Sequence, residues 1–111
     1  MNDKIVVVIS TSDAEKAKTG LMYAVNSVTQ NWMADVKLII FGPAQDLLLS
    51  DNEIKDYIIQ FQEAKGKVTA CKFIAERDKN AKEIASLGVD IEYVGSIISD
   101  FIKEGYIPLI W

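Results

Sequence analysis

The sequence contains no histidine and only one cysteine, Cys71, among its 111 residues. Without histidine, one chain cannot form a Ser-His-Asp triad, a Cys-His dyad or a His-ligated zinc site. A single cysteine also excludes an internal disulfide, a four-cysteine metal site and a dithiol redox cycle within the chain. Any chemistry must therefore use carboxylates, lysines, hydroxyl groups or the lone thiol, and we expect no metal or organic cofactor.

Long apolar runs and an excess of positive charge are missing as well. No run approaches the roughly 20 apolar residues of a membrane-spanning helix. The opening "MNDKIVVVIS" lacks the apolar core and cleavage site of a signal peptide. Twelve basic residues stand against sixteen acidic ones, so the formal net charge of −4 repels phosphate backbones and anionic lipid. We therefore expect a cytoplasmic protein that binds neither nucleic acid nor membrane.

Segments typical of strands and of helices alternate along the chain. Half of the residues are apolar, and the length suits one core, so we expect a single domain over residues 1–111. Continuous β-branched runs such as "KIVVVIS" are typical of strands buried on both faces of a parallel sheet. The alternation predicts the α/β class, with a mainly parallel sheet and helices on both faces. The five expected strands cover residues 4–10, 36–42, 67–74, 91–94 and 106–111.

Capping residues indicate where the helices begin, and a proline indicates the position of the last strand in the sheet. A short helix is expected around residues 79–87, after the third strand. Pro108 cannot donate a ladder hydrogen bond, which favours an edge position for the last strand. The order of the strands does not follow from the pattern. The residues expected to cap helices are Ser12 together with Glu15 in a capping box, Asp51 or Asn52, and Ser96.

A hydroxyl-rich turn, "ISTSDAEKAKTG", follows the first strand. Such a turn at the start of a helix can bind phosphate through free backbone N–H groups. Here Ser12, Asp13 and Glu15 would occupy those donors and bring negative charge to the same place. Helix capping is therefore the favoured interpretation, and binding of a nucleotide or small anion by Ser10, Thr11 and Ser12 is a weaker alternative.

The lone thiol is the main candidate for chemistry. Cys71 lies in "KVTACKFIAERDKNAK", towards the carboxyl end of the expected third strand and ahead of a helix start. Ligands and chemistry gather at this edge of parallel α/β sheets. Free cysteine is also among the most buried residue types, so the alternative is that Cys71 is a small apolar filler of the core.

Positive charge surrounds this cysteine in the sequence. Residues 65–82 hold six basic and two acidic residues, a net charge of +4, whereas the rest of the chain carries −8. Positive charge near a thiol stabilises the nucleophilic thiolate, and equally a persulfide anion. Lys72, Arg77 and Lys79 are therefore candidates for electrostatic support of Cys71, the candidate catalytic residue. Alternatively, these residues are solubilising charges at the ends of strands and helices.

Several segments together resemble the DsrE/DsrF-like sulfur-relay proteins, which include the TusD-type subunits. The resemblance covers about residues 4 to 111 and includes the opening strand "KIVVVIS" and the helix "SDAEKAKTGLMYAVNSV". "GKVTACKFIAE" is similar to the family's third strand, which ends in a cysteine with alanine four residues on. "DVKLIIFGPAQDLLL" and the tail "LGVDIEYVGSIISDFIKEGYIPLIW" resemble two further units. The segments "NWMAD" and "ERDKN" depart from the family, in which glycine or small residues are common at these places.

This resemblance implies a three-layer α/β/α domain that assembles into trimers or hexamers. It also implies persulfide-based sulfur transfer in the cytoplasm, with Cys71 accepting sulfane sulfur from one protein and passing it to another. The alternative is a non-catalytic oligomeric scaffold or regulatory module in which Cys71 is structural. An apolar content of 50% independently favours a homo-oligomer. The segments that supply the apolar excess are "DLLLS", Trp32-Met33 and "IPLIW".

Overall fold

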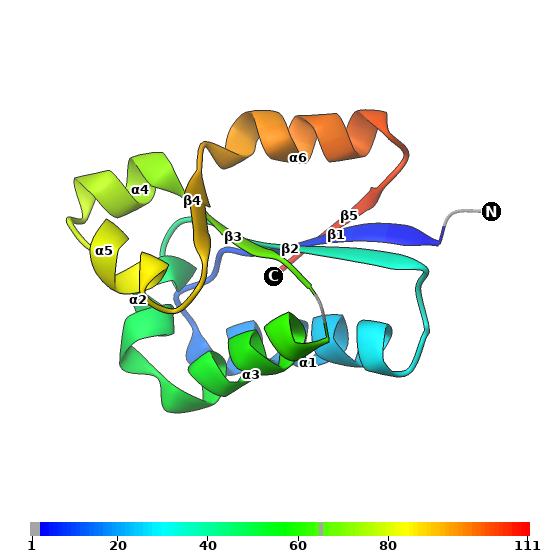
Figure 1. Ribbon diagram of the computed structural model, residues 1–111, viewed down its shortest axis with the longest axis horizontal. Helices are drawn as coiled ribbons and strands as arrows, with labels where there is room; N and C mark the ends of the chain where they lie inside the picture. The colour runs from blue at the N-terminus through cyan, green and yellow to red at the C-terminus, as the bar shows by residue number, and fades with distance from the viewer. Residues whose placement is uncertain (1–2, 65) are drawn as a thin grey trace.

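All five strands of the central sheet run parallel, in the order β4-β3-β2-β1-β5. The computed structural model describes residues 3–64 and 66–111. Figure 1 shows α1 and α3 on one face of the sheet and α6 on the other, which confirms the three-layer α/β/α architecture. The elements are β1 (Lys4–Ile9), α1 (Ala14–Thr29), β2 (Asp35–Ile40), α2 (Ala44–Ser50), α3 (Asn52–Glu63), β3 (Val68–Cys71), α4 (Lys72–Arg77), α5 (Ala81–Ala85), β4 (Asp90–Glu92), α6 (Val94–Lys103) and β5 (Ile107–Ile110).

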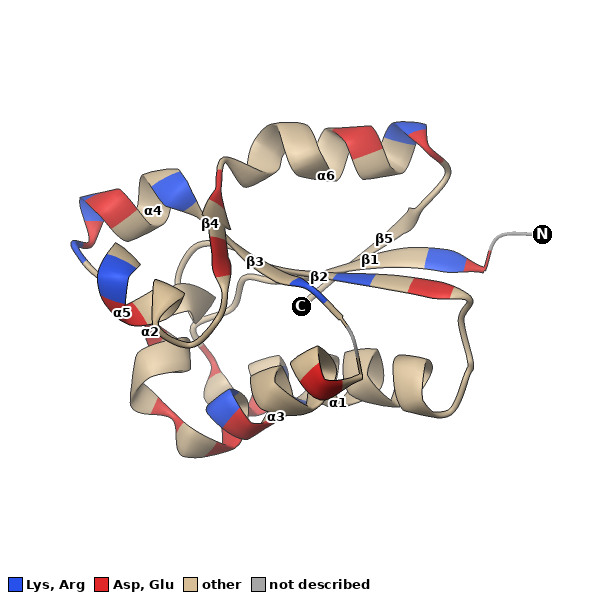
Figure 2. Ribbon diagram, viewed as in Figure 1, with Lys and Arg blue, Asp and Glu red and all other residues tan. Residues whose placement is uncertain are grey.

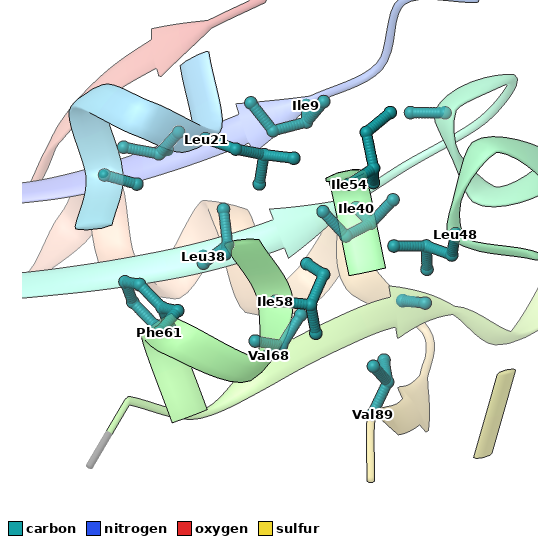
Figure 3. Packing of buried hydrophobic residues seen from close by; sticks show 14 of the residues in the cluster. Ile9, Leu21, Leu38, Ile40, Leu48, Ile54, Ile58, Phe61, Val68 and Val89 are labelled. Atoms are coloured by element: carbon teal, nitrogen blue, oxygen red, sulfur yellow. The ribbon is translucent and has the colours of Figure 1, made fainter. Parts of the chain in front are cut away.

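The sheet separates two apolar clusters of different size. Alternate side chains of a strand point to opposite faces, and β1 contributes Ile5, Val7 and Ile9 to the larger cluster and Val6 and Val8 to the smaller. The larger cluster lies under α1 and α3, where the side chains converge as in Figure 3. Its largest fully buried members include Leu21, Leu38, Leu48, Ile54, Ile58 and Phe61.

The smaller cluster lies between the sheet and α6. Val94 of α6 is fully buried against Val6, Val8 and Ile39, and Cys71 belongs to the same cluster. Helix α6 lies over this face, whereas α1 and α3 lie over the opposite face (Figure 1), where α2 and α5 also contribute buried side chains to the larger cluster.

Gly20 permits close contact between α1 and the sheet. A Cβ atom at this position would lie 2.6 Å from Ile9 Cδ1 and 2.7 Å from the Trp111 ring. Both distances are well below ordinary van der Waals contact, so the helix can lie at this depth only without a side chain here.

The last strand occupies an edge, as Pro108 predicted. The Trp111 N–H donates to Val8 O, and Trp111 O accepts from the Ser10 N–H, so the main chain of Trp111 faces β1. Main-chain groups alternate in direction along a strand. Those of Pro108 and Ile110 therefore point away from β1, towards the open side of the sheet. Because the main chain of Pro108 points to the open side, its lack of an N–H group removes no hydrogen bond to β1.

The helix starts differ in part from the prediction. Asp13, not Ser12, caps α1, because its Oδ1 accepts from the N–H groups of Glu15 and Lys16 at 2.9 and 3.3 Å. The Ser12–Glu15 capping box is therefore wrong. Asp51 caps α3, as one of the two predicted alternatives. The last helix begins at Val94 after Tyr93, so Ser96 lies inside the first turn and does not cap it.

The third strand is shorter than predicted. It ends at Cys71, and residues 72–77, assigned in part to the strand, form α4 instead. The apolar run "CKFI" is compatible with both structures, because a short run carries too little periodicity to separate strand from helix. The helix expected at residues 79–87 is α5 (Ala81–Ala85). In addition, "AQDLLLS" forms α2, and Leu48 within it is fully buried.

Within residues 3–64 and 66–111, no helix has the length and apolar character that crossing a membrane requires.

Candidate functional site

Cys71 is both the last residue of β3 and the N-cap residue of α4. Its backbone is extended, with φ −72° and ψ 123°, and the next residue is already helical. Among the described residues, no capping hydrogen bond from α4 reaches the Cys71 side chain. The thiol therefore stands at the carboxyl edge of the parallel sheet, beside the N–H groups that begin a short helix. Such groups favour negative charge.

The side chain of Gln45 holds the main chain of this cysteine. Gln45 Oε1 accepts from the Cys71 N–H at 3.3 Å, and Gln45 Nε2 donates to Cys71 O at 3.2 Å. The same Oε1 accepts from the Gly42 N–H at 3.1 Å. Gln45 is 0% exposed, so water does not compete for these bonds. Sequence analysis missed this residue, because glutamine in "PAQDLLLS" belongs to no motif.

The thiol lies in a largely apolar environment. Cys71 is 5% exposed and shares the smaller cluster with Val6, Val8, Ile39 and Val94. On the neighbouring strand its register partner is Glu92. The side chain is therefore close to the surface at the end of the sheet, but α6 and the strands cover most of it.

A surface hollow of about 360 Å³ lies beside this position. Cys71 itself does not line the hollow, but the residue after it, Lys72, and its register partner, Glu92, do. Lys72 Nζ lies 5.4 Å from the centroid of the Tyr93 ring, which is within the range of a cation–π interaction. The lining residues are Lys72, Ile91, Glu92, Tyr93, Ser96 and Ile97.

The three predicted supporting residues are not brought together around the thiol. Lys72 follows Cys71 directly and lies at the hollow. Arg77 ends α4, and its Nε lies 3.0 Å from Asp78 Oδ1; this hydrogen bond and the charge of Asp78 raise the pKa of Arg77. Lys79 is exposed, with a left-handed φ of 57°. Only Lys72 is therefore adjacent to Cys71.

Acidic residues compensate much of the positive charge that the sequence gathers here. Lys67 Nζ lies 3.3 Å from Asp90 Oδ2 and 3.5 Å from Glu92 Oε2. The hydrogen bond from Lys67 to Asp90 and the charge of Glu92 raise the pKa of Lys67. Lys65, which the sequence count included, lies outside the described residues. Figure 2 shows both signs of charge on α4 and α5, and negative charge on β4.

A second groove of about 320 Å³ lies between α6 and the sheet. Its two lysines, Lys37 and Lys67, are paired with acids: Lys37 Nζ lies 3.4 Å from Asp35 Oδ2, and Lys67 bridges the two acids of β4. The groove therefore offers a ligand little uncompensated charge. Among the described residues, no cluster of three or more acidic or cysteine side chains could hold a metal ion.

The turn after β1 has little capacity left for an anion. Trp111 O accepts from the N–H groups of Ser10 and Thr11 at 2.6 and 3.2 Å. The Asp13 N–H donates to Thr11 Oγ1 at 3.0 Å. These donors already have partners within the chain, which disfavours the phosphate-binding alternative.

The fold is similar to that of solved structures. The conserved protein of unknown function BT1422 from Bacteroides thetaiotaomicron matches with a TM-score of 0.87 and 24% identity, over 98% of this chain and 95% of that one. The YchN protein from E. coli matches with a TM-score of 0.75 and 12% identity, over 97% and 99%. At these identities the likeness establishes the fold. No protein-family model and no curated protein matches the sequence.

Proposed function

We propose that this protein is a DsrE/DsrF-like (TusD-type) sulfur-relay protein in which Cys71 carries sulfane sulfur as a persulfide. The observation that carries the proposal is the position of the thiol. It ends β3 at the carboxyl edge of a parallel sheet and begins α4, with its main chain held by Gln45. The sequence resemblance and the α/β/α fold support the same assignment. We place this function in the cytoplasm, as one part of the same proposal.

The proposed chemistry is an exchange of one S–S bond for another. The Cys71 thiolate attacks the outer sulfur of a donor persulfide, R–S–SH; a Cys71–S–SH bond forms, the donor S–S bond breaks, and the electron pair leaves with the donor thiolate. A thiolate on an acceptor protein then attacks the outer sulfur of Cys71–S–SH and releases the Cys71 thiolate. No external oxidant or reductant takes part, and no metal or organic cofactor is needed.

The hollow next to Cys71 suits the added sulfur atom. Lys72 lies on its rim and supplies positive charge to a persulfide anion, while Tyr93 supplies an aromatic wall. Because Cys71 is 5% exposed, both transfer steps require a small local movement at the start of α4 or of α6.

Loading with sulfur tests the proposal directly. The protein is treated with a low-molecular-weight persulfide or a thiosulfonate and weighed intact, next to Cys71→Ser. We expect the wild type to gain one sulfur atom, which a thiol reductant removes, and the variant to gain none. Equal gains in both proteins, or none in either, would overturn the persulfide role of Cys71.

The second candidate function is a non-catalytic oligomeric scaffold or regulatory module. The low exposure of Cys71 and its apolar neighbours favour this candidate. In this case an alkylating reagent would modify Cys71 only as fast as the protein unfolds, and Cys71→Ala would retain every assembly property. Alkylation of the folded protein well above the unfolding rate would count against it.

In both candidate functions, the protein acts as a homo-oligomer, either a trimer or a hexamer. Large apolar side chains remain at the surface of the single chain, with Ile110 70% exposed and Trp32 57% exposed. The segment "DLLLS" adds less exposed apolar surface than expected, because Leu48 is fully buried in the core. Assembly through the exposed apolar groups would remove them from water.

A further inference from the structure

We infer that Gln45 is the positioning residue of Cys71: its side-chain amide takes the place of a strand next to the cysteine and thereby sets the direction and accessibility of the thiol. This inference rests on the proposed role of Cys71 in sulfur transfer. Gln45 itself makes no contact with a transferred sulfur atom in this scheme. It acts through the main chain of Cys71.

The ladder between β2 and β3 ends one residue before the cysteine. The last register pair joins Ile40 to Ala70. The next residue, Phe41, still bonds to β1 on the other side, because its N–H donates to Ile9 O at 2.9 Å. The β2–β3 register therefore stops before Cys71, and no β2 residue is paired with Cys71 itself.

Gln45 fills this position with one donor and one acceptor. A primary amide presents the same pair of groups as a peptide unit, and Gln45 uses Oε1 and Nε2 for the Cys71 N–H and C=O. The side chain reaches Cys71 from α2, across a separation of 26 residues. Its third bond, from the Gly42 N–H, ties the turn after β2 to the same amide.

Hydrogen bonds to both the N–H and the C=O of Cys71 restrain the two peptide groups that flank it. The Cα–Cβ bond of Cys71, and with it the thiol, is then held at one angle between the end of the sheet and the start of α4. Because Gln45 is fully buried, an apolar side chain of similar size would remove the bonds of the amide to both groups of Cys71, and water could not readily replace them. The strand-to-helix junction would then open more often, and the thiol would be exposed with it.

Native-state alkylation tests this role. Gln45→Leu and a matched control, Gln62→Leu, are treated with iodoacetamide at urea concentrations below the unfolding transition, and modification of Cys71 is followed by intact mass. Gln62 is a suitable control because its Nε2 donates to Leu87 O at 3.1 Å in a part-buried site away from Cys71. Urea melts of both variants give their global stability.

We expect alkylation of Gln45→Leu to be about fivefold faster than that of the wild type, the ratio that corresponds to the net contribution of one hydrogen bond. The rate should depend little on urea, which is the mark of local opening. Gln62→Leu should alkylate like the wild type while it is folded. An unchanged rate in Gln45→Leu, or the same acceleration in Gln62→Leu at equal stability, would overturn the inference.

Gln45→Glu keeps the inference testable if the leucine variant fails to fold. A protonated carboxyl group can donate to Cys71 O as the amide does, whereas a carboxylate cannot. The alkylation rate of this variant relative to the wild type should therefore rise with pH as the introduced carboxyl group ionises. A ratio that is independent of pH would contradict the role of the donor.

Sulfur loading of the same samples separates this inference from the proposed function. If the wild type takes up no sulfur but Gln45→Leu alkylates faster with little urea dependence, the sulfur-carrier function fails and the positioning role stands. If the wild type loads and Gln45→Leu shows the same loading and alkylation, the positioning role fails and the function stands.

Discussion

Tyr106 donates its phenolic hydrogen bond to Asp35, which joins the start of β5 to the start of β2 across the intervening strand β1. Two lysines complete the arrangement. Lys4 Nζ lies 4.9 Å from the centroid of the Tyr106 ring, and Lys37 Nζ lies 3.4 Å from Asp35 Oδ2. Together with Lys4 of β1, the bond links three strands at the amino end of the sheet, far from Cys71 at the carboxyl end.

This hydrogen bond predicts a loss of stability at alkaline pH. The bond to Asp35, together with partial burial, raises the pKa of Tyr106 from 10.0 to about 12. Only the protonated phenol can donate, so its contribution to stability is complete below pH 10.0 and is lost as the pH rises towards about 12. In that interval the unfolded phenol ionises while the folded one does not, and unfolding becomes more favourable.

Comparison with Tyr106→Phe isolates this effect from other groups that titrate in the same range. The variant should be less stable than the wild type by about 1–2 kcal/mol at neutral pH, because a part-buried hydrogen bond to a carboxylate is lost. The difference should shrink between pH 10 and about 12 in urea melts. A difference that stays constant over this range would show that Tyr106 is not the titrating group.

Two glycines in helices should respond in opposite ways to alanine. Gly20→Ala introduces a Cβ that overlaps Ile9 and Trp111, and overpacking typically costs about 1–3 kcal/mol, against a gain of up to about 1 kcal/mol in helix propensity. Gly95→Ala introduces a Cβ with no atom within 4 Å, so it should gain up to about 1 kcal/mol. Thermal or urea unfolding measures the stability of both variants relative to the wild type. Equal stability of the two variants would contradict the close contact at Gly20.

Neighbouring isoleucines of α3 test the position of the core. Ile58 is 1% exposed and Ile59 is 47% exposed. Ile58→Ala removes fully buried methyl groups and should cost about 2–5 kcal/mol. Ile59→Ala should change the free energy of unfolding by less than about 0.5 kcal/mol in the single chain. Similar losses at both positions would mean that Ile59 is covered, for instance by a second copy.

Charge on the exposed edge should weaken assembly. We expect the wild type to elute above the monomer mass in size-exclusion chromatography at micromolar concentration. Ile110→Lys places a charge on the most exposed of the large apolar side chains and should shift the protein towards monomer. Gln60→Lys adds the same charge to the exposed face of α3 as a control. A monomeric wild type would refute the predicted homo-oligomer.

Much of the fold follows from local signals in the sequence. Each of the five predicted strands overlaps an observed one, although β4 ends at Glu92 and not at Val94; Pro108 placed the last strand at an edge, because its missing donor has a direct structural meaning. The Ser12 cap was wrong because Ser12 and Asp13 are both good capping residues, and local sequence does not rank two adjacent candidates. The end of β3 was wrong because "CKFI" is apolar in either conformation.

The candidate site was less predictable, because it depends on contacts between distant segments. The sequence prediction counted only charges close to Cys71 along the chain. In the structure, Asp90 and Glu92 of the neighbouring strand β4 form ion pairs with Lys67 and compensate its charge. In the same way, the bonds from Gln45 depend on where β2 leaves the sheet. Neither strand order nor the exit of a strand can be derived from composition or periodicity.

The direction of the Pro108 main chain has a consequence for how copies of this protein can meet. A strand that approached β5 from outside would find a carbonyl at this position but no N–H to return a bond, so the hydrogen-bonded ribbon cannot continue without a gap. Any contact along this edge would then depend on exposed side chains such as Ile107 and Ile110. Proline thus prevents a continuous hydrogen-bonded sheet from extending across this edge.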